Sequence, residues 1–159
     1  EMQRSLVGSE MCIRDSVMRV YNCHFESYNI SISRLKKSVR EQDGDMMWET
    51  EEKMKKSIRR RPEQVDKVMS DIEDCTLEAI VTGDFNDNPM SYTYNRLKKG
   101  RDDSFVEAGK GFGATYSFLW PFIRIDYILY PSHFTAVSHS VPRVRYSDHY
   151  PVIAEINLK

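Results

Sequence analysis

The sequence predicts a layered α/β domain of the α+β type, in which helices cover β-sheets. Three observations support this fold class: an alternating run near the N-terminus, a long charged segment with apolar residues at helical spacing, and four further strand-like runs with one short helix among them. This order of elements favours a layered domain over a helical bundle or an all-β sandwich. The 159 residues correspond to one domain of ordinary size.

The N-terminal half contains the first strand and the helical segment. Residues 17–22, VMRVYN, alternate as a strand does, and the phrase YNCHFES continues through His24 into a loop. Residues 30–75 should be helical, with a break at Asp43-Gly44 and a boundary between two helices at Arg61-Pro62, because proline is tolerated in a first turn but not in a helix interior. Basic and acidic residues are mixed along this segment, which indicates a solvated helix face rather than a phosphate-binding surface.

The C-terminal half contains the remaining strands. The run 79–82, AIVT, is short, rich in β-branched residues and followed by Gly83, which predicts a buried strand. A short helix is expected over 91–98, with Ser91 as its N-cap. Further strands are predicted at 124–130, 134–138 and 151–158.

Composition excludes several classes of protein and leaves the compartment open. The formal net charge of −1 gives no support for a strongly basic nucleic-acid surface or an acidic tail. No apolar stretch reaches eighteen residues, so we expect no membrane span within these residues. The three cysteines have neither metal-type spacing nor the even number of a simple disulfide framework.

The phrase GDFNDNP, residues 83–89, places polar side chains directly after the strand at 79–82. If the extended backbone continues, Asp84 and Asn86 point to the same face, because side chains alternate with a period of two. The alternative is an ordinary turn, since Gly, Asn, Asp and Pro are the commonest turn residues. A second group of polar residues that converges on the same point would favour a site.

Two later segments supply such a group. Asp126 lies in the otherwise apolar run RIDYILY, where a carboxylate needs a cationic or hydrogen-bonding partner. The partner is either Arg124, in a structural ion pair, or His149, which follows Asp148 in the loop YSDHYPV. If Asp126 accepts a hydrogen bond from His149, it fixes the tautomer and leaves the second ring nitrogen free to act as a base. His149 considered alone is equally consistent with a surface histidine.

The acidic and amide side chains also predict a divalent metal site. Asp148 offers a hard oxygen ligand suited to Mg²⁺ or Mn²⁺, and Asp84 and Asn86 offer further oxygen atoms. The three segments together are difficult to explain as unrelated turns, so the sequence predicts a polar site at the ends of several strands.

These phrases resemble the C-terminal signature of the endonuclease/exonuclease/phosphatase family, which includes pancreatic-type deoxyribonuclease, abasic-site endonucleases, inositol polyphosphate 5-phosphatases and sphingomyelinases. The matching phrases are GDFNDNP, RIDYIL and SDHYPV, and YNCHFES resembles the family's asparagine-x-histidine strand, with Phe25 in place of the usual leucine. SYTYNRL and GKGFGATYSF are similar to an uncharacterised bacterial branch. The resemblance covers Val17 to Lys159 and implies part of a four-layer sandwich of two mainly antiparallel sheets flanked by helices.

The resemblance implies a role for each matching residue in metal-assisted attack of water on a phosphoester. Asp84 would orient or deprotonate the water, Asn86 would hold the phosphate, and His149 with Asp126 would act as base or as a phosphate-stabilising acid. Members differ over which of Asp84 and His149 takes the proton. Asp148 would help to hold Mg²⁺ or Mn²⁺, with Asp84 and Asn86 as further candidate ligands, and Asn22 and His24 would contact the scissile phosphate.

The N-terminal half of the family's fold has no counterpart here. The family's metal-binding glutamate, usually preceded by glutamine, is absent between Val17 and Asp84. We therefore expect a truncated domain over 17–159, with a helical insert at about 30–75, that is inactive by itself. Many members of the bacterial branch carry membrane helices ahead of the domain, so a membrane anchor in a longer parent protein stays open.

Residues 6–16, LVGSEMCIRDS, show neither helical nor strand periodicity. Translated back into codons, they resemble a transposon-end adapter used for sequencing libraries. We expect residues 1–16 to be a non-native tail and the natural sequence to begin near Val17. The alternative is a genuine but irregular N-terminal segment.

The substrate stays open among phosphate esters, namely nucleic acid, phosphoinositide or a phospholipid headgroup, and no obligate protein partner is evident. The segment 143–146 offers arginine and tyrosine for a nucleic acid, and 118–122 offers an apolar rim for a lipid, but a strand-to-loop connection and a buried aromatic plug explain them equally well. The alternative to an enzyme is a module of the same fold that binds phosphate ligands without hydrolysis or docks a protein through residues 30–75.

Overall fold

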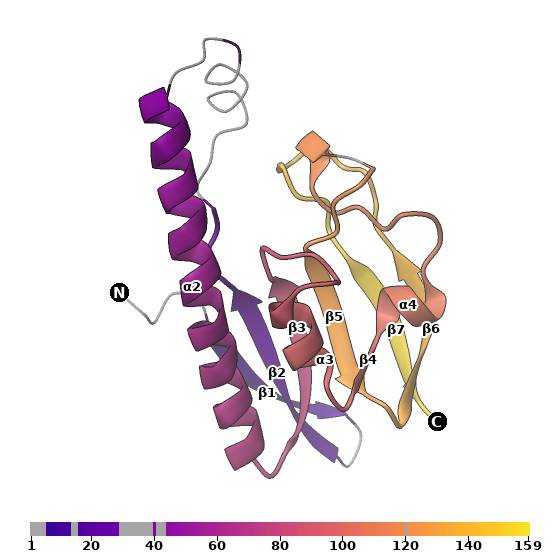
Figure 1. Cartoon of the computed structure of the whole chain (residues 1–159). Helices are drawn as coiled ribbons and strands as arrows, with labels where there is room; N and C mark the ends of the chain where they lie inside the picture. Colours follow the sequence, from indigo (N-terminus) through magenta and orange to yellow (C-terminus); the bar gives the residue numbers. More distant parts are fainter. Residues whose placement is uncertain (1–5, 14–15, 29–39, 41–43, 120) are drawn as a thin grey trace.

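The fold is a mixed α/β arrangement with two sheets, as the sequence predicts (Figure 1). The computed structural model describes residues 6–13, 16–28, 40, 44–119 and 121–159. Its elements are β1 (Leu6–Ile13), β2 (Ser16–His24), α2 (Gly44–Asp74), β3 (Glu78–Asp84), α3 (Tyr92–Lys98), β4 (Arg101–Asp103), α4 (Ser104–Ala108), the 3₁₀ helix η2 (Ser117–Leu119), β5 (Asp126–Pro131), β6 (Phe134–Ser140) and β7 (Ile153–Leu158).

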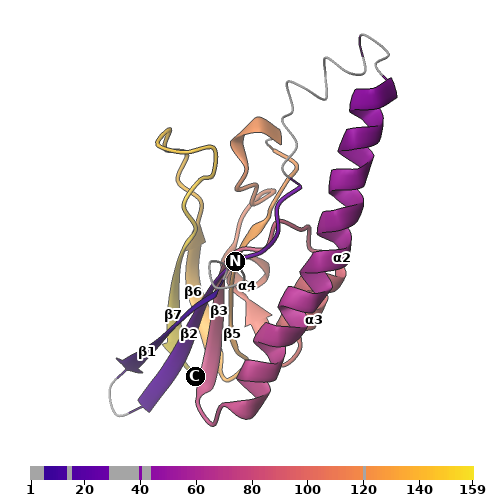
Figure 2. The ribbon, with the colours of Figure 1, turned by 90° about the vertical axis from the view of Figure 1, so that its left-hand side faces the viewer.

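The larger sheet has the strand order β1-β2-β3-β5-β4, and β6 pairs with β7 in a separate two-stranded sheet. β2 runs parallel to β3, a pairing that requires a long crossover connection, and α2 lies in that connection. β3 runs antiparallel to β5. Figure 2 shows α2 and α3 on one side of the larger sheet and the β6–β7 pair on the other.

The hydrophobic core fills the layer between the larger sheet and the two helices. Alternate residues of β2 point into this layer, and the phenol of Tyr21 also donates a hydrogen bond to Asp71 of α2 at 2.6 Å. Asn22 and His24 take the opposite face and are exposed. The core comprises Tyr21, Cys23, Phe25, Val65, Val68, Met69, Ala79, Val81, Phe85, Tyr94, Leu97, Tyr127 and Leu129.

Helix α2 corrects one prediction. It begins at Gly44, close to the expected break, but it continues through Pro62 to Asp74 instead of ending there. Proline removes one backbone hydrogen bond. Buried residues on both sides of it, Ser57 and Val65 among them, fix the helix against the sheet and hold the two turns in line. The expected helical residues 30–39 and 41–43 lie outside the described residues.

The N-terminal segment forms a strand that the sequence does not predict, and its non-native origin stays a prediction. Leu6–Ile13 forms β1, which pairs antiparallel with β2 from Leu6 opposite Cys23 to Ile13 opposite Ser16. The sequence shows no strand periodicity there, and backbone pairing does not require it. The edge of β2 offers unpaired N–H and C=O groups to any neighbouring extended segment.

The remaining elements agree with the sequence apart from their ends. Ser91 caps α3 as predicted, because its hydroxyl accepts a hydrogen bond from the backbone N–H of Tyr94 at 3.2 Å. β5 begins at Asp126, so this carboxylate lies at the start of a strand and not in its middle. The short elements β4 and α4 were not predicted. None of the helices in the described ranges has a stretch long and apolar enough to cross a lipid bilayer.

Candidate active site

The register of three strands brings the candidate side chains together. His24 at the end of β2 is the pairing partner of Asp84 at the end of β3, and Asp84 is the partner of Asp126 at the start of β5. Gly83 allows this close approach, because its φ is +121° and a Cβ there would lie 2.0 Å from the carbonyl oxygen of Cys23. The site is therefore determined by sheet pairing.

Asp84 and Asn86 are joined through a turn and not through an extended strand. Asn86 has a positive φ of 50°, its backbone N–H donates to Oδ1 of Asp84 at 2.7 Å, and its Nδ2 donates to Oδ2 at 3.0 Å. The second Nδ2 proton reaches the carbonyl oxygen of Phe25 at 3.0 Å. The extended continuation is therefore wrong, and the alternative, a turn, brings the Asn86 amide to Asp84. The backbone N–H and one side-chain N–H of Asn86 therefore hold the two oxygens of Asp84, and the other side-chain N–H ties Asn86 to the loop after β2.

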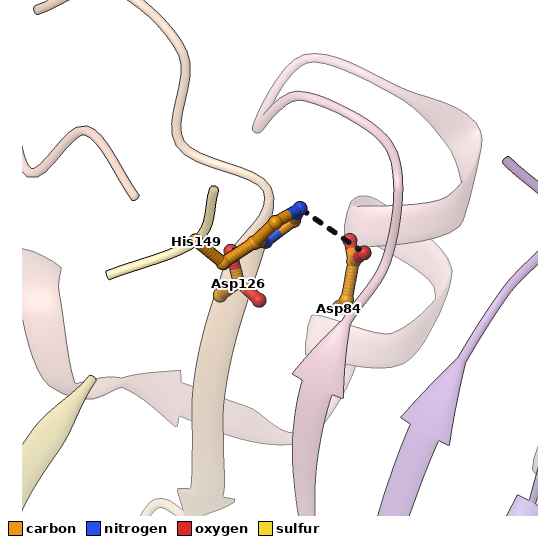
Figure 3. Close-up of side chains that lie close together, drawn as sticks. All are labelled: Asp84, Asp126 and His149. Atoms are coloured by element: carbon orange, nitrogen blue, oxygen red, sulfur yellow. Dashed lines mark hydrogen bonds and ion pairs between the residues drawn. The ribbon is translucent and has the colours of Figure 1, made fainter. Parts of the chain in front are cut away.

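His149 stands between two carboxylates, as Figure 3 shows. Its Nδ1 lies 2.9 Å from Oδ2 of Asp126, and its Nε2 lies 3.9 Å from Oδ2 of Asp84. Because a carboxylate only accepts, Nδ1 carries the proton of this hydrogen bond and Nε2 faces Asp84. The alternative partner Arg124 instead pairs with Asp103 at 2.7 Å. The predicted contact between Asp126 and His149 is present.

Backbone contacts hold both partners in place. The Thr115 hydroxyl accepts hydrogen bonds from the backbone N–H groups of Ile125 and Asp126 at 3.1 and 3.2 Å. Tyr116 forms an isolated antiparallel bridge with His149, and the two rings are 5.1 Å apart. The backbone bridge and the ring contact with Tyr116 therefore place His149 beside Asp126.

The pKa values of Asp84 and His149, the two groups that can exchange protons, are both shifted. Burial, followed by the charge of Asp126, raises the pKa of Asp84 above its ordinary value, although the backbone N–H of Asn86 opposes this. The hydrogen bond from Asp126 raises the pKa of His149, although burial opposes it. Both groups therefore hold protons more tightly than they would in water, which suits acid and base chemistry.

The cluster also offers ligands for a cation. One ligand atom each from Asp84, Asp126 and His149 lies within 4.8 Å of the others. Asp148 is exposed and outside this cluster, and its Oδ1 accepts a hydrogen bond from Ser147 at 3.1 Å. Nε2 of the exposed His24 lies 3.7 Å from Oδ2 of Asp84.

A comparison of the sequence with protein-family models matches residues 57–149, more than half of the chain, to the endonuclease/exonuclease/phosphatase family. The chain belongs to this family. No match was found among curated proteins.

Several solved structures share the fold of this chain. A functionally unknown conserved protein from Enterococcus faecalis V583 aligns with a TM-score of 0.65 and 17% identity over 92% of this chain and 52% of its own. A family protein from Bacteroides thetaiotaomicron gives 0.63 and 21% over 92% and 52%. A mannosyl-6-phosphatase from B. thetaiotaomicron VPI-5482 gives 0.52 and 21% over 90% and 52%. The chain spans about half the length of these proteins.

Sequence reasoning missed several residues around the family's signature. Arg61 was assigned to a solvated helix face, but it is buried and forms an ion pair with Asp87 at 2.9 Å. Thr115 and Tyr116 carried no signal apart from their place in a phrase shared with the bacterial branch. The boundary between the buried and exposed faces of α2 could have identified Arg61, since it lies four residues before the buried Val65.

The raised pKa of His149 predicts a pH-dependent contribution to stability. The folded state binds this proton more tightly than the unfolded chain, so the stabilisation is complete below the ordinary pKa of 6.5 and is lost as the pH rises through the folded value. The raised pKa of Asp84 acts with the same sign in a more acidic range. With EDTA present, the thermal midpoint of His149→Gln should fall further below wild type at about pH 5.5 than at about pH 8.5.

Asp126→Asn provides the matched background for this measurement. Without the carboxylate that stabilises the imidazolium, His149→Gln should shift the midpoint by nearly the same amount at both pH values. If Asp126 is present and His149→Gln lowers the thermal midpoint by the same amount at both pH values, the proton-linked stabilisation by His149 is contradicted.

Proposed function

We propose that the chain carries the catalytic residues of a divalent-metal-dependent phosphoester hydrolase, in which water attacks a phosphate. The observation that supports this function best is the alignment of Asp126, His149 and Asp84, in which one carboxylate fixes the imidazole and the other lies 3.9 Å from its free nitrogen. Family membership agrees with phosphoester chemistry in general. A positioned acid–base pair beside an acidic ligand set is the arrangement that such hydrolysis requires.

The proton of the attacking water passes to Asp84 or to Nε2 of His149, which together form the proton-accepting pair. Asp126 holds His149 in the tautomer that presents Nε2, and it stabilises the imidazolium once the proton has arrived. His24 extends the same row and is exposed for contact with a phosphate oxygen, with Asn22 two residues earlier on the same face of β2. Asn86 positions Asp84, and it would have to release one hydrogen bond to donate to a phosphate.

The cluster suits Mg²⁺ or Mn²⁺, because two of its three ligand atoms are carboxylate oxygens, from Asp84 and Asp126, and the third is an imidazole nitrogen of His149. Asp84 would hold the cation, and Asp148 and Asn86 are further candidate ligands outside the cluster. A bound cation offsets negative charge on the phosphate oxygens. We also propose that a further acidic ligand lies outside residues 17–159, consistent with a chain that spans about half the length of similar structures.

Two chromogenic substrates test this function: bis(p-nitrophenyl) phosphate for diesterase and p-nitrophenyl phosphate for monoesterase activity. Hydrolysis of one of them should require Mg²⁺ or Mn²⁺, fall to the background without enzyme in EDTA, and return when metal is restored. Asp84→Asn should abolish it. Glu155→Gln, which removes an exposed carboxylate on β7, is the matched control and should have no effect.

The same assays apply to a longer version, extended by the part of the similar structures that this chain does not span. If a missing ligand limits the cation, the longer version should be more active and should need less Mg²⁺. Activity that persists in EDTA would contradict metal dependence. The proposed hydrolase function would be wrong if neither version hydrolysed these substrates, DNA, phosphoinositide, sphingomyelin or a sugar phosphate.

A further inference from the structure

Helix α2 carries a buried polar stripe where it passes the candidate site. The buried residues after Pro62 are apolar, namely Val65, Val68 and Met69, whereas the buried residues before it are Ser57 and Arg61. A guanidinium is costly to bury, and an apolar side chain at this position would pack against the sheet at a lower desolvation cost. The contacts of Arg61 show what the charge does there.

Arg61 contacts both loops that shape the site. Its Nη1 donates to the backbone carbonyl of Asn86 at 2.7 Å and lies 2.9 Å from Oδ2 of Asp87. Its guanidinium carbon lies 4.2 Å from the centre of the Tyr28 ring, in the loop that follows β2. The side chain is only 2% exposed, so water screens these interactions weakly.

Other hydrogen bonds make the same two loops rigid. The hydroxyl of Thr93 donates to Asp87 Oδ2 at 3.0 Å, and the phenol of Tyr127 donates to the Asp87 carbonyl at 2.8 Å. On the β2 side, Ser57 donates to the carbonyl of Ser27 at 2.8 Å, and Gln64 accepts from the backbone N–H of Glu26 at 2.9 Å. From α2, Arg61 reaches the turn containing Asn86.

The geometry points to Arg61 as a positioning residue for the proposed hydrolytic site: it clamps the turn at Asn86 and Asp87 so that Asn86 keeps its hydrogen bonds to Asp84. This inference rests on the proposed function for its effect on catalysis. Asn86 has a left-handed backbone conformation, which asparagine adopts more readily than most non-glycine residues but still at a cost, so outside contacts help to hold the turn. Arg61 supplies one contact to the carbonyl of this residue and one to the side chain of the next.

The inference predicts an effect that passes from Arg61 through Asn86 to Asp84. Loss of the clamp lets the turn relax, and Asp84 then loses part of the pair of hydrogen bonds that orients both its oxygens. The contacts of Arg61 are with Asn86, Asp87 and Tyr28, and not with Asn22 and His24, the proposed phosphate-binding residues of β2. The expected kinetic result is a lower kcat with a small change in KM.

Four variants of the full chain test the inference. Arg61→Met keeps the aliphatic stem and removes all donors, whereas Arg61→Lys keeps the charge and one contact. Asp87→Asn weakens the ion pair from the other side. Arg59→Met removes an exposed arginine of the same helix and is the matched control.

The first measurement does not depend on activity. In the ¹⁵N NMR spectrum, the side-chain amide of Asn86 should shift and exchange its protons faster with water in Arg61→Met, less so in Arg61→Lys, and not at all in Arg59→Met. Arg61→Lys is also the variant that decides the matter if Arg61→Met does not fold. Unchanged Asn86 signals in a folded Arg61 variant overturn the inference.

The second measurement is kinetic and uses whichever version and substrate are active. Arg61→Met should lower kcat by about 10- to 100-fold, the range expected for a displacement on the ångström scale, with partial rescue in Arg61→Lys. Asp87→Asn combined with Arg61→Met should cost less than the product of the single losses. A reduced thermal midpoint with unchanged kcat would show a purely structural role. Absence of activity in every version would reject the hydrolase, while the NMR result would still decide the role of Arg61.

Discussion

His149→Ala is expected to lower the kcat of the proposed hydrolase by about 10²–10⁴, the range for loss of a positioned acid or base. The variant removes the imidazole that lies 2.9 Å from Asp126 and 3.9 Å from Asp84, and no other described side chain bridges these two carboxylates. Initial rates at saturating Mg²⁺ provide the measurement. The thermal midpoint at about pH 8 should stay near that of wild type, because proton-linked stabilisation by His149 is smallest at alkaline pH.

His139→Ala is the matched histidine control. His139 is also partly buried and contacts a polar side chain, since its Nδ1 lies 2.9 Å from the hydroxyl of Ser104, but it belongs to β6 and not to the site. Its kcat should equal that of wild type. The kcat of Asp126→Asn should lie between those of His139→Ala and His149→Ala, because the imidazole remains but the charge that orients it is lost. Equal activity in His149→Ala and wild type would remove His149 from the mechanism.

Local patterns predicted the elements that position the site. The β-branched run before Gly83 and the apolar run around Asp126 form adjacent strands, and pairing of these strands brings Asp84 opposite Asp126. The need of Asp126 for a donor was predictable, because a carboxylate beside apolar neighbours is costly without one. The choice of His149 over Arg124 was not, since both can donate. It depends on the buried carboxylate of Asp103, which pairs with Arg124.

Tertiary contacts override local signals where the prediction failed. Pro62 predicts a helix boundary, but packing of α2 against the sheet keeps the helix continuous. The turn at Asn86 has a positive φ that sequence spacing cannot specify, and Arg61 contacts it from a helix 25 positions earlier in the chain. Asp148 lies outside the acidic cluster although it adjoins His149, because neighbours in a loop point in different directions.

The buried pair of Arg124 and Asp103 should make Arg124→Met the most destabilising of these changes. The two side chains are 7% and 0% exposed and 2.7 Å apart. The guanidinium also lies 4.6 Å from the ring centres of both Phe105 and Tyr127. Its removal leaves the Asp103 charge buried with only neutral donors, the Tyr94 hydroxyl and the Phe105 backbone N–H. Breaking one side of such a pair costs about 3–5 kcal/mol.

Urea unfolding of Arg124→Met should therefore show a lower midpoint with an unchanged m-value, which identifies a change in stability and not in the surface exposed on unfolding. Arg145→Met, at an exposed arginine, should unfold like wild type. The double variant Arg124→Met with Asp103→Asn distinguishes the ion pair from general packing, because it removes the unpaired charge. The free energy of unfolding that the double variant loses should be clearly smaller than the sum of the losses in the two single variants. Additive losses would show that the two charges do not depend on each other, and the cost of Arg124→Met would then come from its contacts with the aromatic rings.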